Sequence, residues 1–187
     1  MKVTTAVLAG GGAAAVAGVG TYVGLVSGAM PLDVGVGRRM RRLGPLTVDV
    51  EAQRELVFDV IAAPYAERAP RSLREKVEVL ERGSDMVLAA HRTPIRGRLV
   101  ATTVETVRFT RPERVDFRLV RGPVPYVVER FELSESDAGT RLAYDGDLGT
   151  DLGRLGQAWG DLIADRWERV VAASFQTIKT EAERRTG

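Results

Sequence analysis

The sequence predicts an α+β protein in which a curved antiparallel sheet wraps around a long C-terminal helix, preceded by one transmembrane helix. Three observations predict this architecture. Within residues 3–32 the only ionisable side chain is that of Tyr22. Six β-like runs separated by turn residues follow between residues 76 and 148. Residues 151–185 then repeat apolar side chains at spacings of three and four, the period of an amphipathic helix.

Residues 1–32 are expected to form a transmembrane helix, because about 20 apolar residues cross a bilayer. Arginines that follow such a span stay on the cytoplasmic side, which places the N-terminus outside and the domain in the cytoplasm of a single-pass cell-membrane protein. We expect these arginines to contact anionic headgroups; they are Arg38, Arg39, Arg41 and Arg42. The alternatives are a flexible Gly/Ala leader and a cleaved signal peptide, with a small-residue cleavage site at 27–29.

Three glycines of this segment, Gly20, Gly24 and Gly28, recur every four residues and therefore lie near one face of a helix. Small residues let a second helix approach closely in a membrane. The spacing predicts a packing face for a transmembrane protein partner or for self-association. The alternative is that glycine is simply abundant in this segment.

Charge and composition exclude several functions. Residues 1–42 carry five basic and one acidic side chain, which leaves 22 basic and 24 acidic residues in the rest of the chain. A slightly acidic domain lacks the basic face that binds nucleic acid. The chain has no cysteine and His91 is its one histidine, so no metal site is expected. No glycine-rich phosphate loop follows a strand, and no cofactor is expected.

The domain is expected at 46–187, after a basic juxtamembrane linker at 33–45 that is rich in proline and glycine. Residues 46–52 alternate as a strand, and 53–63 place apolar residues at helical spacing. The final helix has an expected N-cap at Asp151. Its apolar positions are Leu155, Trp159, Leu162, Ile163, Val170, Val171, Phe175 and Ile178. The six strands are expected at 76–82, 86–91, 98–110, 114–121, 126–134 and 140–148.

This order of elements resembles the helix-grip fold of the START/SRPBCC superfamily, which includes polyketide cyclase/dehydrase-like proteins. The resemblance spans residues 44–185. It is carried by LTVDVEAQRELVFDVIAA at 46–63, VETVRFTRPERVDFRLV at 104–120, the run Gly122-Pro-Val-Pro, the strand 126–133 and the aromatic closing helix. It implies a cavity between the sheet and the last helix that accepts lipids, quinones, polyketides or steroid-like molecules. The predicted membrane helix departs from most of the superfamily.

Two glutamates stand out as candidate site residues, because period-two counting places Glu105 and Glu129 among apolar neighbours on their strands. Such carboxylates can orient a polar ligand head, or act as acid and base if burial raises a pKa. The alternatives are salt bridges to nearby arginines (Arg108, Arg118, Arg130) or an outward turn near Pro125. The predicted ligand-binding residues are Leu99, Ala101, Thr103, Glu105, Val107, Glu129, Phe131, Tyr144, Trp159, Ile163 and Trp167.

His91 is the third candidate for acid–base chemistry, because its ordinary pKa is near neutrality. It stands at an expected strand end next to Arg92, so we expect it to face solvent. The leading hypothesis is a membrane-tethered, non-enzymatic binding or carrier module for a hydrophobic lipid-like ligand, with quinones among the candidates. One alternative is an accessory subunit of a membrane complex that docks through its glycine-rich helix. A second is a cyclase or dehydratase that uses Glu105 or Glu129.

Overall fold

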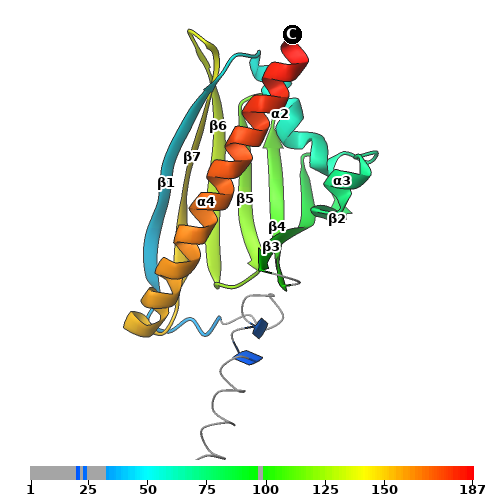
Figure 1. Ribbon diagram of the computed structural model, residues 1–187. Coiled ribbons are helices and arrows are strands. Elements are labelled where there is room, and N and C mark those ends of the chain that lie inside the picture. Colours follow the sequence, from blue (N-terminus) through cyan, green and yellow to red (C-terminus); the bar gives the residue numbers. More distant parts are fainter. Residues whose placement is uncertain (1–19, 22, 25–32, 97–98) are drawn as a thin grey trace, which may run out of the picture.

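The computed structural model describes residues 20–21, 23–24, 33–96 and 99–187. Seven antiparallel strands form one sheet in the order β1-β7-β6-β5-β4-β3-β2, and the long helix α4 crosses it (Figure 1). This arrangement confirms the α+β part of the prediction, an antiparallel sheet with a long C-terminal helix. The elements are β1 (Arg39–Val50), α2 (Arg54–Ala62), the 3-10 turn η1 (Ala63–Tyr65), α3 (Arg71–Arg74), β2 (Val77–Arg82), β3 (Met86–Arg96), β4 (Leu99–Thr110), β5 (Arg114–Arg121), β6 (Tyr126–Ser136), β7 (Gly139–Thr150) and α4 (Gly153–Thr186).

The core lies between the inner face of the sheet and α4 because alternate strand residues are apolar. Helix α4 packs mainly on β1 and β7, and α2 packs on α4. Inner-face side chains of the strands are fully buried there, among them Leu43, Val50, Leu142, Tyr144 and Leu148. Four aromatic rings fill the centre with tilted and edge-to-face contacts; they are Phe117, Phe131, Tyr144 and Phe175.

Strand β1 begins at Arg39, so the prediction of a linker at 33–45 and a domain start at 46 was wrong. The register with β7 runs from Arg39 opposite Thr150 to Val50 opposite Thr140, with an irregularity between Leu43 and Leu46. The alternation of the strand is broken at Gly44, whose φ of 77° is a conformation that favours glycine. That break hid the first half of the strand from period-two counting.

Strand β3 is longer than predicted and continues past His91 to Arg96. The neighbouring β2 begins at Val77, opposite His91. Beyond that point β3 is an edge strand, where the missing N–H of Pro94 can be tolerated. Pro94 and Gly97 are typical turn residues, and the sequence therefore predicts a strand end at 91, but Pro94 lies inside the strand, opposite Val100.

Asp151 does not cap α4 as predicted, because the N-cap residue is Leu152 in a left-handed conformation. The fully buried Asp151 carboxylate instead accepts hydrogen bonds from the backbone N–H groups of Val34 and Gly35, at 2.8 and 2.7 Å, and from Arg38 Nε at 2.8 Å. These bonds lower the pKa of Asp151 to about 2, with Arg38 as the largest cause. The start of β1 is thereby fastened to the start of α4.

The buried face of α4 differs from the predicted apolar stripe. Leu155, Leu162 and Val170 are exposed, while the glycines at 156 and 160 are buried. A Cβ on Gly160 would lie 2.9 Å from the Thr150 side chain, and one on Gly156 would collide with the Asp151 carbonyl oxygen. The first turns of α4 therefore approach the sheet through small residues, which an apolar pattern does not register.

Among the residues that the structure describes, no helix is long and apolar enough to cross a membrane. The predicted membrane helix at 1–32, including Gly28, lies mostly outside the described residues. Gly20 and Gly24 are described, and a Cβ added at Gly20 would meet no atom within 4 Å. The predicted packing face of the three glycines stays a prediction.

Candidate functional site

The inner face of β3 and β4 carries a buried histidine–carboxylate pair. His91 Nδ1 lies 3.0 Å from Glu105 Oε2. His91 and Thr103 are cross-strand partners, and Glu105 follows Thr103 by two residues on the same face. Thr103 Oγ1 donates a 2.6 Å hydrogen bond to Glu105 Oε1. Both oxygens of this carboxylate therefore have partners, and one of those partners fixes the imidazole ring.

The other imidazole nitrogen meets a phenol. Tyr65 Oη lies 3.1 Å from His91 Nε2, and the two rings are 5.8 Å apart in an edge contact. Tyr65 reaches this position from η1, whose backbone carbonyl at Tyr65 accepts a hydrogen bond from Arg82 of β2. The turn that follows α2 is thus fastened to the sheet edge, and Tyr65, His91 and Glu105 form a continuous hydrogen-bonded chain.

A second buried carboxylate lies two strands away, on β6. Glu129 Oε2 accepts hydrogen bonds from Tyr144 Oη at 2.9 Å and from Trp167 Nε1 at 2.7 Å. Opposite Glu129 on β7 stands Gly146, where an added Cβ would lie 2.8 Å from the Glu129 Cβ. Because Trp167 belongs to α4, the closing helix contributes directly to the surroundings of this carboxyl group.

The two carboxyl groups have opposite pKa shifts. Burial raises the pKa of Glu105, but the charge of His91 and its hydrogen bond outweigh burial, and the net pKa is lowered. Burial and the nearby charge of Glu105 raise the pKa of Glu129 to about 8, against the opposing effect of its two hydrogen bonds. At neutral pH one interior therefore holds an ionised Glu105 and a largely protonated Glu129.

The pKa values of the imidazole and the two phenols beside the carboxyl groups are shifted as well. Burial lowers the pKa of His91, but the charge and hydrogen bond of Glu105 outweigh it and leave the pKa raised. Burial and the charge of Glu105 raise the pKa of Tyr65 well above its ordinary value. Burial, the charge of Glu129 and their hydrogen bond do the same for Tyr144. Both phenols are therefore hydrogen-bond donors or acceptors at neutral pH and not phenolates.

Of the three sequence candidates for acid–base chemistry, Glu105 and Glu129 face inward as the period-two count predicted. The alternatives of salt bridges or an outward bulge were wrong, because Arg108 pairs with Asp85 and Arg130 with Asp116 and Glu132. The prediction that His91 faces solvent was also wrong. Its side chain is 18% exposed, because β3 continues past it and Glu105 and Tyr65 cover both ring nitrogens.

The remaining predicted ligand-binding residues spread over the inner face. Val107, Phe131, Tyr144 and Ile163 are buried in the core, and Ala101, Thr103, Trp159 and Trp167 are partly exposed. Trp159 Nε1 donates to the carbonyl oxygen of Pro123 at 2.8 Å. The side chain of Leu99 lies outside the described part of the chain. Thr103 stands opposite His91, and Ala101 lies two residues before Thr103 on the same face of β4, so this side of the acid–base cluster is partly exposed.

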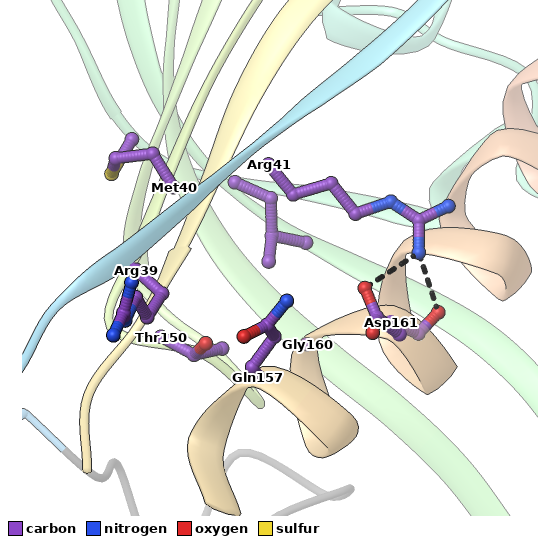
Figure 2. Close-up of a pocket in the computed structure, with 8 residues that line it drawn as sticks. Arg39, Met40, Arg41, Thr150, Gln157, Gly160 and Asp161 are labelled. Atoms are coloured by element: carbon purple, nitrogen blue, oxygen red, sulfur yellow. Dashed lines mark hydrogen bonds and ion pairs between the residues drawn. The ribbon is translucent and has the colours of Figure 1, made fainter. Parts of the chain in front are cut away.

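Two pockets lie elsewhere. One, of about 190 Å³, lies between β1, the end of β7 and the start of α4, where Arg41 donates to Asp161 (Figure 2). The other, of about 470 Å³, lies beside the start of α2 and the end of α4, near Arg54, Glu135 and Thr186. None of the eleven predicted ligand-binding residues lines either pocket. A ligand space beside Glu105 and Glu129 therefore stays a prediction.

Three of the four arginines predicted to contact headgroups take part in ion pairs within the domain. Arg38 binds Asp151, Arg41 binds Asp161 and Asp165, and Arg42 pairs with Asp147. The reason is that β1 begins at Arg39, which brings this basic run against the acidic side chains of β7 and α4. In the described residues no group of three His, Asp or Glu side chains is arranged to hold a metal ion.

No protein-family model matches the sequence, and no curated protein matches it either. Solved structures do match. The Zhui aromatase/cyclase from Streptomyces sp. R1128 is 24% identical, with a TM-score of 0.64 over 80% of this chain and 97% of that chain. The di-domain aromatase/cyclase StfQ of the steffimycin biosynthetic pathway is 14% identical, with a TM-score of 0.59 over 80% and 52%.

Norcoclaurine synthase from Thalictrum flavum, solved with dopamine and hydroxybenzaldehyde, is 10% identical, with a TM-score of 0.54 over 77% of this chain and 87% of that chain. At these identities the likeness establishes the fold. The chain therefore has the helix-grip fold that its order of elements predicted, with α4 as the gripped helix.

Proposed function

We propose that the chain binds a small, largely apolar molecule that carries a carbonyl group and a neighbouring hydroxyl group, and eliminates water from it by acid–base catalysis. The observation that carries the proposal is the placement of Glu129 and the His91–Glu105 pair on one inner face of the grip. When the surroundings of two titratable groups shift their pKa values in opposite directions, one group can act as an acid and the other as a base.

The geometry gives each group a role. Glu105 holds His91 through Nδ1, so Nε2 is the nitrogen that exchanges a proton, with Tyr65 beside it. Both hydrogen bonds to Glu129 end on Oε2, which leaves Oε1 to carry the proton of the neutral acid. The strands that carry Glu105 and Glu129 are two apart, about 10 Å across the sheet, and His91 lies one strand beyond Glu105, so the substrate is placed between His91 Nε2 and Glu129 Oε1.

The elimination needs His91, Glu129 and solvent, and no further reactant. The neutral form of His91, which exchanges with the protonated form near neutral pH, takes the proton from the carbon beside the substrate carbonyl, and the electron pair forms the new double bond. The bond from the neighbouring carbon to its hydroxyl group breaks, and Glu129 donates its proton so that this group leaves as water. Solvent then carries the proton from His91 back to Glu129. Loss of water is the kind of step that ring closure and aromatisation require, and two of the structural neighbours are described as aromatase/cyclases.

The test uses 4-hydroxy-4-phenylbutan-2-one, an apolar β-hydroxy ketone whose dehydration to the conjugated enone is followed by ultraviolet absorbance. We expect the chain to accelerate this reaction, and Glu129→Gln and His91→Gln to abolish the acceleration. The matched control is Glu132→Gln, an exposed carboxylate on the same strand that pairs with Arg130. Equal rates for all four proteins would refute the proposed chemistry.

A second function, binding without turnover, is supported by the apolar and aromatic side chains that line the inner face around the two carboxyl groups. In that case His91, Glu105 and Glu129 orient the polar end of a hydrophobic ligand. Binding of a hydrophobic fluorophore that Thr103→Trp reduces, together with no dehydration activity, would support this alternative over the first. The tether at 1–32 and the accessory-subunit role are carried forward as proposals from the sequence.

A further inference from the structure

Exposed apolar side chains gather at one end of the domain. Leu155 is 82% exposed and Val36 is 67% exposed, far above the ordinary exposure of such residues. Only three of the large exposed apolar residues in the described sheet and α4 lie elsewhere; they are Leu80, Leu162 and Val170. Those at this end are Val34, Val36, Met40, Val100, Val120, Leu152 and Leu155.

The topology brings these residues together from distant parts of the sequence. Met40 stands opposite Gly149, and Tyr126 stands opposite the same glycine on its other side, so β1, β7 and β6 have this end in common. The β3–β4 hairpin, the β5–β6 connection and the start of α4 lie at the lower end of the sheet in Figure 1. We call the residues Asp33–Met40, Leu99–Ala101, Val120–Tyr126 and Leu148–Ala158 the apolar end.

The apolar end is also basic. Its only acidic residues are Asp33 and Asp151, and both are paired with Arg38. Three further arginines of the apolar end are exposed and take part in none of the ion pairs found among the described residues; they are Arg39, Arg121 and Arg154. An apolar surface with uncompensated arginines at its rim is complementary to an anionic interface that has an apolar interior.

The chain enters the domain at this same end. Val34 and Gly35 are bound to Asp151, and the N–H groups of Leu152 and Gly153 donate to the carbonyl oxygens of Val36 and Gly37. The 30 residues immediately before Asp33 contain no charged side chain. A membrane segment of that length would therefore join the domain beside Leu152 and Leu155.

We propose that the apolar end is a docking surface for a bilayer containing anionic lipids, with Val36, Leu155 and Val120 in the interfacial region and Arg39, Arg121 and Arg154 at the headgroups. The inference rests on the membrane tether carried forward above and is independent of the acid–base step. It assigns the headgroup role to a different arginine set from the one that the sequence indicated, because Arg38, Arg41 and Arg42 are held in ion pairs.

The test exploits the absence of cysteine, since each substitution adds the only thiol of the chain. Leu155→Cys and Val120→Cys place an environment-sensitive fluorophore at the apolar end. Leu80→Cys and Val170→Cys place it on exposed apolar positions elsewhere. The full chain is reconstituted into phosphatidylcholine vesicles with and without phosphatidylglycerol, some carrying quencher-labelled lipid. We expect the probes at 155 and 120 to lose most of their emission to the lipid quencher and the probes at 80 and 170 to lose little.

A charge-reversed variant, the charge arm of the test, carries glutamate in place of each of Arg39, Arg121 and Arg154. These three substitutions should abolish the excess quenching at 155 and 120. The matched control replaces three exposed arginines near α3, Arg68, Arg71 and Arg74, and should leave the quenching unchanged. Equal quenching at all four probe positions in a chain that floats with vesicles would overturn the docking surface alone. A chain that does not float overturns the tether and the docking surface together.

One further outcome separates a lipid partner from a second copy of the chain. Probes at 155 and 120 that shift with protein concentration in detergent, and not with lipid composition, would show self-association of the apolar end and overturn the proposal. Urea unfolding of the charge-arm variant, followed by the fluorescence of Trp159 and Trp167, serves as the folding control. Its midpoint should match that of the unmodified chain, because the three arginines take part in none of the ion pairs found among the described residues.

Discussion

Replacing Glu129 with glutamine should change how the stability of the domain depends on pH. Burial and Glu105 raise the pKa of Glu129 from 4.5 to about 8. Between these values the unfolded chain has released a proton that the folded chain retains, so stability falls as pH rises. Each pH unit in this window costs about 1.4 kcal/mol. From about pH 5 to about pH 6.5 the loss is about 2 kcal/mol.

This window isolates Glu129 from its neighbours. The pKa of Glu105 is lowered from 4.5, so its contribution changes below the window. The pKa of His91 is raised from 6.5, so the stability that protonated His91 contributes is lost above the range from about pH 5 to about pH 6.5. Glutamine preserves the shape of the side chain and its acceptor oxygen for Tyr144 and Trp167, but it does not titrate. The variant should therefore lack the loss of about 2 kcal/mol.

The assay is urea unfolding in mild detergent, followed by the fluorescence of Trp159 and Trp167, at the two ends of the window. The free energy of unfolding of the unmodified chain should fall relative to Glu129→Gln as pH rises. Glu132→Gln, which removes an exposed carboxylate from the same strand, should keep the slope of the unmodified chain. Parallel pH profiles for the unmodified chain and Glu129→Gln would refute a buried, protonated Glu129.

Three further predictions concern single contacts. His91→Gln should destabilise the fold by about 3 kcal/mol at about pH 6, where His91 is mostly protonated, because a buried Glu105 loses its counter-charge; a loss of less than about 1 kcal/mol in the free energy of unfolding would contradict the ion pair. Gly146→Ala should cost about 1–3 kcal/mol through overpacking against Glu129 and the Val128 carbonyl oxygen. Gly83→Ala, where an added Cβ would lie 3.3 Å from the Met86 carbonyl oxygen and meet no other atom within 4 Å, should cost less. Asp151→Asn should release the segment before β1 and speed tryptic cleavage after Arg38 and Arg39, whereas Asp161→Asn should not; unchanged cleavage would show that Asp151 does not fasten this segment.

Sequence periodicity predicted the parts of the site that lie on regular strands. Glu105 and Glu129 alternate with apolar neighbours, and in the structure both face inward. His91 was misplaced because Pro94 and Gly97 suggested a turn, whereas the end of β2 makes that part of β3 an edge that accepts proline. The local sequence pattern therefore predicted which segments form strands, but the length of β3 depended on its pairing with the neighbouring strand.

Other site features arise from contacts between distant residues. Tyr65 follows Pro64 in a short 3-10 turn, where no period indicates which way a side chain points, and its partner His91 is 26 residues away. Asp151 has the residue type of a helix cap, yet its partners Val34 and Gly35 lie more than a hundred residues earlier. The apolar end escaped sequence analysis because its exposed residues come from four separate segments.

The most direct test of the account is a carbon-13 NMR titration of the glutamate carboxyl groups, with the resonances of Glu105 and Glu129 assigned by glutamine substitution. The account predicts that the Glu129 carboxyl carbon titrates with a midpoint of about 8. The Glu105 carboxyl carbon should titrate below the ordinary glutamate pKa of 4.5, because His91 lowers the pKa of Glu105. If both carbons titrate together near 4.5, the two carboxyl groups share one protonation state at neutral pH and cannot serve as an acid and an ionised partner of the base.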